Sequence, residues 1–195
     1  FDAIAPPVMF GDGNHFEQAM RVTGKLTLRG TQHAVDCFTI RDRSWGKPRP
    51  EDNMALPPMS WVTAVFNKDF AFNCNLFDDA RESPELATKF AMPPEKLLNG
   101  GWIWRNGKVA RIVAGRKRVQ RETATQLPLQ VELELTDDAG QTIKVHGSLQ
   151  ASCAWSTWPN LSFVVNQMRW ECEGETAYGD CQEAFWTDYL NAFGS

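Results

Sequence analysis

A single carboxylate, Asp42, is the first candidate for chemistry. It lies in the segment Arg41-Asp42-Arg43-Ser44-Trp45-Gly46, at the end of a strand-like run. Because alternate residues of a strand share a face, Asp42 falls on the same side as Phe38 and Ile40. A carboxylate in an apolar face either has a dedicated partner or a raised pKa, since burial disfavours its charged form. We therefore predict that Asp42 is a general acid. A buried ion pair with an arginine, or a turn cap, is the alternative.

Three further residues could take part in proton transfer. Glu183 shares its face with Cys181 and Phe185, so it is a second acid in apolar register. His15 and Glu17 share a strand face about 6–7 Å apart, and one could orient the other at a barrel rim. Alternation places this pair opposite the apolar face of its strand, so a solvated strand start is the alternative. With three histidines in the chain, we expect no multi-histidine metal site.

The aromatic residues suggest an apolar cavity. The chain has eight tryptophans and twelve phenylalanines but two tyrosines. Core filling is the ordinary use of such residues, and a ligand cavity with aromatic walls is the alternative. Tryptophan rings around a protonated acid could stabilise a developing carbocation by cation–π attraction. The predicted substrate-binding residues are Trp45, Phe38, Trp61, Trp102, Trp104, Trp170 and Tyr178.

Composition excludes several classes of protein. The net charge is −4 over 195 residues, which disfavours a nucleic-acid partner. The basic run 111–121 predicts a solvated strand face, or a patch for an anionic ligand or a membrane surface. Five widely spaced cysteines indicate no disulfide framework and suit a reducing cytoplasm. The sequence has no secretory signal, no apolar run of about 18 residues and no nucleotide-binding or metalloprotease motif, so we expect no membrane span and no cofactor.

Alternation and turn residues predict the elements that position these side chains. Residues 1–14 indicate a loop or linker, and residues 15–195 a single barrel domain. Residues 15–29 alternate as a long strand with Phe16, Met20, Val22, Leu26 and Leu28 on its apolar face. Hairpins are expected around residues 67–69 and around Asn106-Gly107, a dipeptide that favours tight turns. The apolar face of a later strand is expected to contain Ile143, Val145, Leu149, Ala151, Cys153 and Trp155.

Helix is expected in two places only. Ser83-Pro84-Glu85 indicates a helix start within residues 81–100, and residues 187–193 indicate a short terminal helix. The rest is about ten strands joined by short turns. We therefore predict an all-β fold, an antiparallel lipocalin-like up-and-down barrel of about 8–10 strands, because closure removes exposed sheet edges.

Three segments carry a family resemblance. They are His15-Phe16-Glu17-Gln18, the run 37–46 (Cys-Phe-Thr-Ile-Arg-Asp-Arg-Ser-Trp-Gly), and the run 177–183 (Ala-Tyr-Gly-Asp-Cys-Gln-Glu). Together they resemble the AttH-like and carotenoid hydratase (hydroxyneurosporene synthase) superfamily. That resemblance implies paired lipocalin-type barrels acting on isoprenoid or other apolar substrates by protonation. The chain is similar to the C-terminal barrel alone, so the resemblance implies a second barrel from a homo-oligomer, a missing N-terminal domain or a partner chain.

These observations lead to one functional hypothesis and two alternatives. The hypothesis is a cofactor-independent hydratase, dehydratase or cyclase acting on a terpenoid, steroid or similar apolar molecule. Asp42 would be the acid, with Glu183 or Glu17 as a base or water-positioning group. The first alternative is a non-catalytic, lipocalin-like carrier of an apolar ligand. The second is a half-barrel that only completes a partner.

Overall fold

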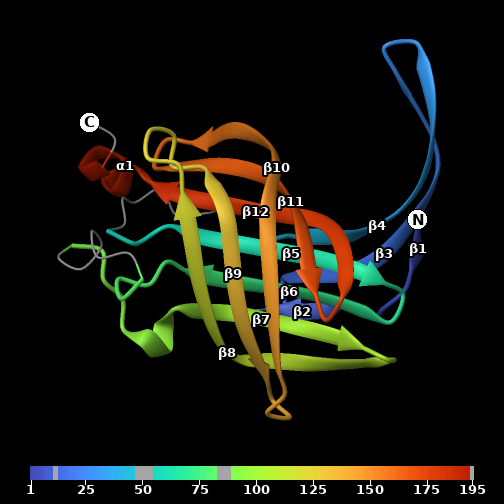
Figure 1. Ribbon diagram of the computed structural model, residues 1–195, viewed down its shortest axis with the longest axis horizontal. Helices are drawn as coiled ribbons and strands as arrows, with labels where there is room; N and C mark the ends of the chain where they lie inside the picture. The colour runs from blue at the N-terminus through green and yellow to red at the C-terminus, as the bar shows by residue number, and fades with distance from the viewer. Residues whose placement is uncertain (11–12, 47–54, 83–88, 194–195) are drawn as a thin grey trace.

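Eight antiparallel strands close into a barrel, which confirms the predicted fold class. The computed structural model describes residues 1–10, 13–46, 55–82 and 89–193. Around the barrel the strands follow the order β10-β11-β12-β5-β6-β7-β8-β9, and β9 pairs with β10 to close it (Figure 1). The barrel strands are β5 (Met59–Asn67), β6 (Phe70–Phe77), β7 (Leu98–Arg105), β8 (Lys108–Arg121), β9 (Pro128–Asp137), β10 (Thr142–Trp158), β11 (Leu161–Cys172) and β12 (Glu175–Trp186).

Tight two-residue turns fix the register of two hairpins of the barrel. Asn106 and Gly107 join β7 to β8 with φ values of 49° and 83°, as the sequence predicts. Glu173 and Gly174 join β11 to β12 in the same way, with φ values of 51° and 84°. A turn with positive φ at both central residues has a twist that matches the twist of the two strands it joins. Each pairing is therefore set locally.

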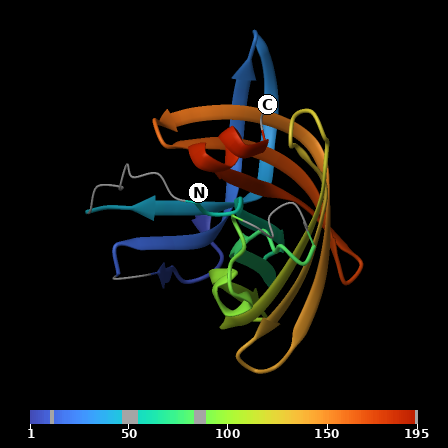
Figure 2. The same ribbon diagram turned by 90° about the vertical axis from the view of Figure 1, so that its left-hand side faces the viewer.

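A second sheet lies outside the barrel. It contains β1 (Asp2–Ala3), β2 (Val8–Phe10), β3 (His15–Leu28) and β4 (Thr31–Ser44), with β3 paired to the other three. The interpretation of residues 1–14 as a loop is therefore wrong for β1 and β2. Figure 2 shows this sheet beside the barrel wall rather than within it. Its contact with the wall consists of Ala5, Ala19, Val65, Ala71, Trp102 and Trp104, with Ile4, Val8, Phe10, Phe38 and Ile40 packed around them.

The face of β3 that packs on the barrel is the one that we expected to be solvated. Glu17 and Ala19 are fully buried, whereas Leu26 and Leu28 on the opposite face are 52% and 57% exposed. The apolar pattern is a poor guide here because β3 contacts the barrel only near its start. Its second half pairs with β4 alone among the described strands. The alternative in which His15 and Glu17 lie at a solvated strand start is therefore wrong, since Glu17 is fully buried and His15 is partly buried.

Register shifts in β8 and β10 change which residues face inward. In β8, Ile112 pairs with Asp137 and Ala114 with Thr136, so Val113 is an extra residue. Beyond this bulge, Lys117 pairs with the buried Leu133 and shares its inward face. The prediction of a wholly solvated basic run is therefore wrong, because a bulge exchanges the two faces of a strand.

The shift in β10 has the same consequence. Leu149 pairs with Met168, and Ala151 pairs with Gln167, which neighbours Met168 on β11. Neighbours in a strand point to opposite faces, so Ala151 lies on the face opposite Leu149. Cys153 follows Ala151 on that outer face. The single apolar face predicted for residues 143–155 is therefore wrong beyond the bulge.

Side chains fill the barrel interior. Phe72, Leu135, Met168 and Trp170 are each less than 2% exposed and belong to one continuous core. The ring of Trp170 lies against Gly147, where a Cβ atom would overlap it. The described interior is thus a packed core, with polar side chains gathered toward one end.

Within the described ranges, helix is confined to short segments. The 3₁₀ turn η2 (Pro94–Lys96) lies in the region that we expected to contain a helix, and the predicted start at 83–85 lies outside the described residues. The predicted terminal helix is confirmed as α1 (Thr187–Phe193). None of the described helices has the length and apolar character needed to cross a membrane.

Candidate functional site

The β3–β4 hairpin brings three of the four predicted catalytic residues together. Its turn at Arg29 and Gly30 sets a continuous register in which Glu17 pairs with Asp42 and His15 pairs with Ser44. Directly opposed residues share a face and have Cβ atoms about 4.5–5.5 Å apart. These residues lie where the hairpin meets the barrel. We call His15, Glu17, Asp42 and Ser44 the hairpin cluster.

Glu17 is the fixed centre of the hairpin cluster. Its side chain is fully buried and accepts hydrogen bonds from two barrel tryptophans. Trp61 Nε1 donates to Glu17 Oε1 at 2.5 Å, and Trp102 Nε1 donates to Oε2 at 3.1 Å. A buried carboxylate needs such donors to offset its desolvation, and two indoles on rigid strands also fix its orientation. The predicted substrate-binding residues Trp61 and Trp102 therefore hold this acid.

His15 connects the buried acid to the surface. Its Nε2 atom is 3.4 Å from Glu17 Oε1, and its Nδ1 atom is 2.8 Å from Ser44 Oγ and 3.6 Å from Asp42 Oδ1. The hydrogen bond with Glu17 raises the pKa of His15 and burial lowers it, while the charge of Asp42 raises it, with a net upward shift. An imidazole between two carboxylates can pass a proton between them.

Asp42 is the most accessible acid of the hairpin cluster. It lies on the same face as Phe38 and Ile40, as predicted, but its side chain is 42% exposed. Burial still raises the pKa of Asp42, more than the charge of His15 lowers it. A cavity of about 530 Å³ opens beside it, lined by Phe1, Met20, Thr39, Ile40, Arg41 and Asp42. Its size lies within the range of roughly 300–1,000 Å³ typical of small-molecule sites.

The same residues could in principle hold a metal ion. His15, Glu17 and Asp42 each offer one ligand atom, and these atoms lie within 4.8 Å of one another. However, both Glu17 oxygens accept indole N–H groups, and both His15 nitrogens have polar neighbours. Each carboxylate oxygen has two lone pairs, so the indole hydrogen bonds leave Glu17 able to bind an ion. Ligation by His15 would instead break its hydrogen bond to Glu17 or Ser44, and in this respect the geometry fits a hydrogen-bonded relay better than a metal centre.

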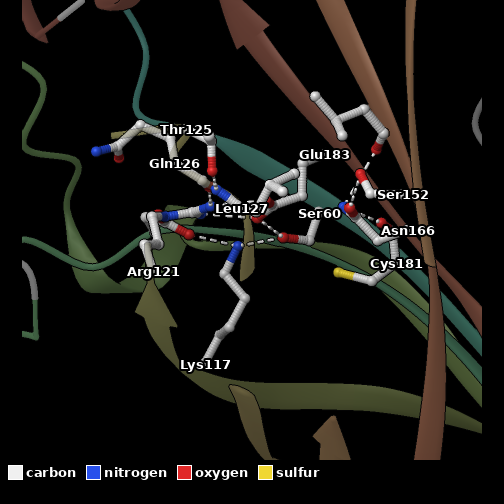
Figure 3. Close-up of polar contacts among 12 residues, drawn as sticks. Ser60, Lys117, Arg121, Thr125, Gln126, Leu127, Ser152, Asn166, Cys181 and Glu183 are labelled. Carbon is white, nitrogen blue, oxygen red and sulfur yellow. Dashed lines mark hydrogen bonds and ion pairs between the residues drawn. The ribbon is translucent and has the colours of Figure 1, made fainter. Parts of the chain in front are cut away.

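Glu183, the fourth predicted catalytic residue, belongs to a different group of charges inside the barrel. It is fully buried and shares the inward face of Cys181, as its register predicted. Arg121 donates to it twice, from Nη1 to Oε2 at 2.6 Å and from Nη2 to Oε1 at 2.7 Å (Figure 3). Ser60 Oγ also donates to Oε1 at 3.1 Å.

Glu183 belongs to a group of buried polar side chains that we call the lumen network. It contains two cations, Lys117 and Arg121, two anions, Asp78 and Glu183, and the hydroxyl group of Ser60. Arg121 Nη2 is 2.8 Å from Asp78 Oδ2, and Lys117 Nζ lies 2.5 Å from Asp78 Oδ1 and donates to Ser60 Oγ at 2.6 Å. Burial raises the pKa of Asp78, but the charges of Arg121 and Lys117 outweigh it and hold the pKa below its usual range. Since the charges balance and each has partners, the network can stabilise one end of the barrel.

One strand separates the two groups. Ser60 and Trp61 are consecutive in β5, and Ser60 donates inward to Glu183 while Trp61 donates outward to Glu17. The four predicted catalytic residues thus fall on opposite sides of the barrel wall. The structure joins His15, Glu17 and Asp42, and leaves Glu183 with the lumen network.

The remaining predicted substrate-binding residues are dispersed. Phe38 is half-buried against the barrel wall, and Trp104 lies in the same contact and donates to Lys68 O at 3.0 Å. Trp170 is in the interior core. Trp45 and Tyr178 are 49% and 61% exposed. These aromatics therefore do not line one common cavity.

Five polar residues of these groups were missed from the sequence, namely Ser44, Ser60, Asp78, Lys117 and Arg121. Ser44 could have been found by counting outward from the Arg29-Gly30 turn, which places it opposite His15. Lys117 and Arg121 were assigned to a solvated face, and no residue in the sequence marks the Val113 bulge that turns them inward. The five cysteines are all unpaired, as expected.

Comparison with known proteins gives a family and no activity. A family model described as a domain of unknown function (DUF7064) matches residues 1–187. No curated protein and no solved structure gives a significant match.

Proposed function

We propose that this chain, a member of the DUF7064 family, catalyses a cofactor-independent proton-transfer reaction at the hairpin cluster. The reaction would be a hydration, dehydration or cyclisation of a terpenoid, steroid or other apolar molecule. The observation that carries the proposal is the position of His15 between a fully buried, fixed Glu17 and the more exposed Asp42. Residues poised to exchange a proton beside a cavity are typical of acid–base sites.

Each member of the hairpin cluster has a separate part in this proposal. Asp42, with its raised pKa, donates a proton to an alkene carbon or a hydroxyl leaving group in the adjoining cavity. In hydration, water then adds to the cation, and one of its protons returns to Asp42 directly or through His15. In dehydration, the protonated hydroxyl leaves as water, and Asp42 takes a proton from the carbon next to the cation. A cyclised cation loses a proton to Asp42 in the same way. The hydrogen bond from His15 to Glu17 stabilises the imidazolium form of His15. Arg41 lines the same cavity and could orient a polar substituent.

The carrier alternative remains a proposal with less support, because the described interior of the barrel is filled by side chains. Asp42→Asn separates the two proposals, since it keeps the shape and removes the acid. Asp36→Asn is a matched control on the same strand, where Asp36 is an exposed partner of Arg21.

The experiment incubates the protein with terpenoid and steroid alkenes and alcohols in deuterium oxide without added cofactor. Mass spectrometry then detects solvent deuterium at carbon, or the gain or loss of water. We expect Asp42→Asn to lower turnover by roughly 10²–10⁴-fold, as for other general acids, and Asp36→Asn to leave it unchanged. Equal loss in both variants, or ligand binding without any turnover in the parent protein, would refute the enzymatic proposal.

A further inference from the structure

We propose that the tip of the β3–β4 hairpin docks on a membrane surface that carries anionic lipid headgroups. The relevant segment is residues 22–37, which we call the arm. The arm projects away from the barrel in both views (Figures 1 and 2). Among the described strands, β1 and β2 pair with β3 only up to Arg21, so the arm strands pair only with each other. Seven residues beyond Arg21 reach about 23 Å at 3.3 Å per residue.

The exposed apolar side chains of the hairpin lie at its tip. Leu26 and Leu28 share one face and are 52% and 57% exposed. Nearer the base, the same face is covered by the protein itself. Met20 is 6% exposed, and Phe16 contacts the Trp45 ring and the Arg41 guanidinium at 6.1 Å and 5.0 Å between centres. Along this face of β3, the apolar side chains that are more than half exposed, Leu26 and Leu28, therefore lie at the tip, where a lipid surface could bury them.

The charge around these leucines is positive. Between Val22 and Val35 the chain has Lys25 and Arg29 but no aspartate or glutamate, although the whole chain carries a net charge of −4. Basic residues close to an anionic leaflet each strengthen membrane partition, by roughly five-fold. A locally cationic tip on an acidic protein therefore favours an anionic surface and directs the arm toward it.

The geometry also matches the depth of interfacial binding. Leu28 directly precedes the Arg29-Gly30 turn and Leu26 lies two residues earlier, so both are within about 10 Å of the tip. Apolar faces of interfacial segments enter the headgroup region by about 5–10 Å. Arg29 lies in the turn next to Leu28, and Lys25 lies on the other face of the arm, which also includes Thr23, Thr27 and Asp36. Both cations would lie at headgroup level once the tip enters the surface.

A second copy of the chain fits the arm less well than a lipid surface does. Face-to-face packing of two arms would bring the same cations together, and the arm offers no aromatic side chain as an anchor. The inference does not depend on the proposed proton transfer. If both are correct, the arm would bring the protein to the phase in which apolar substrates dissolve.

The experiment is co-sedimentation with two sets of vesicles, phosphatidylcholine alone and equal parts phosphatidylcholine and phosphatidylserine. The variants are Leu26→Asp/Leu28→Asp and, as a control, Val113→Asp, whose parent side chain is 58% exposed on the barrel. Thermal unfolding of each variant shows whether it folds. Size-exclusion chromatography with light scattering reports oligomeric state.

We expect the parent protein and Val113→Asp to sediment with the phosphatidylserine vesicles at low salt, at least tenfold more than with phosphatidylcholine alone. High salt and the double variant should each abolish that difference. Equal sedimentation by the parent and a folded double variant, or no sedimentation by the parent, would overturn the proposal. A parent dimer that the double variant converts to monomer would also overturn it, because it would assign the leucines to a protein interface.

Discussion

The lumen network makes a quantitative prediction for Arg121→Met. Arg121 donates twice to Glu183 and once to Asp78, and its side chain is 10% exposed. Without it, Lys117 would be the remaining network cation for two buried carboxylates. Removing one partner of a buried ion pair costs about 3–5 kcal/mol, because it leaves a charge uncompensated. For a domain of this size that loss corresponds to a fall of about 6–20 °C in Tm.

Arg118→Met is the matched control on the same strand. Arg118 points outward, is 55% exposed, and pairs with Glu82 and Glu132. Exposed pairs of this kind contribute about 0–1 kcal/mol, so Tm should change little. Calorimetry and urea unfolding of both variants give the comparison.

A double variant, Arg121→Met/Glu183→Gln, tests the cause of the loss. It removes the uncompensated charge and should recover part of the stability lost in Arg121→Met. If Arg121→Met is no less stable than Arg118→Met, the network does not stabilise the barrel. If the double variant recovers nothing, uncompensated charge is not the reason for the loss.

Further predictions concern the hairpin cluster and the interior core. NMR titration should show the pKa of His15 above its ordinary value of 6.5, and Glu17→Gln should lower it; an unchanged value would contradict the relay. The raised pKa of His15 stabilises the fold fully below pH 6.5, and that gain is lost as pH rises through the raised value. The stability advantage of the parent over His15→Gln should therefore shrink as pH rises above 6.5. Prolonged EDTA treatment should leave Tm unchanged, since both ring nitrogens of His15 are already hydrogen-bonded, to Ser44 and Glu17; a fall in Tm restored by zinc would instead assign a metal to the cluster. Gly147→Ala should destabilise the barrel by about 1–3 kcal/mol in urea unfolding, because its Cβ would overlap Trp170, and an unchanged midpoint would refute that contact.

The strands and turns followed from local chemistry, which is why the fold class could be predicted. Asn106-Gly107 specifies its turn through two positive φ values, and the hairpin forms where it was expected. The terminal helix was also found at residues 187–193. Closure into eight strands with a separate outer sheet depends on long-range pairing, which periodicity does not encode.

The site was predicted only in part, because contacts between elements far apart in the sequence decide which face of a strand is buried. Alternation correctly placed Asp42 with Phe38 and Ile40, but its exposure depends on how β4 meets the barrel. The solvated interpretation of Glu17 arose because alternation places it opposite the apolar face of its strand. Its burial is possible because Trp61 and Trp102, far along the chain, supply two donors.

The bulge at Val113 makes the length of β8 matter more than its composition. Deleting Val113 would remove the bulge but keep Lys117 and Arg121 facing inward, because Ile112 and Ala114 would become neighbours and keep their partners Asp137 and Thr136. Inserting one residue between Ala114 and Lys117 would instead move both cations to the outward face and the neighbouring exposed arginines into the core. The same insertion in the connection 122–126 would change no strand face. Among related sequences, insertions should therefore be rare in β8 beyond Ala114 and common in that loop.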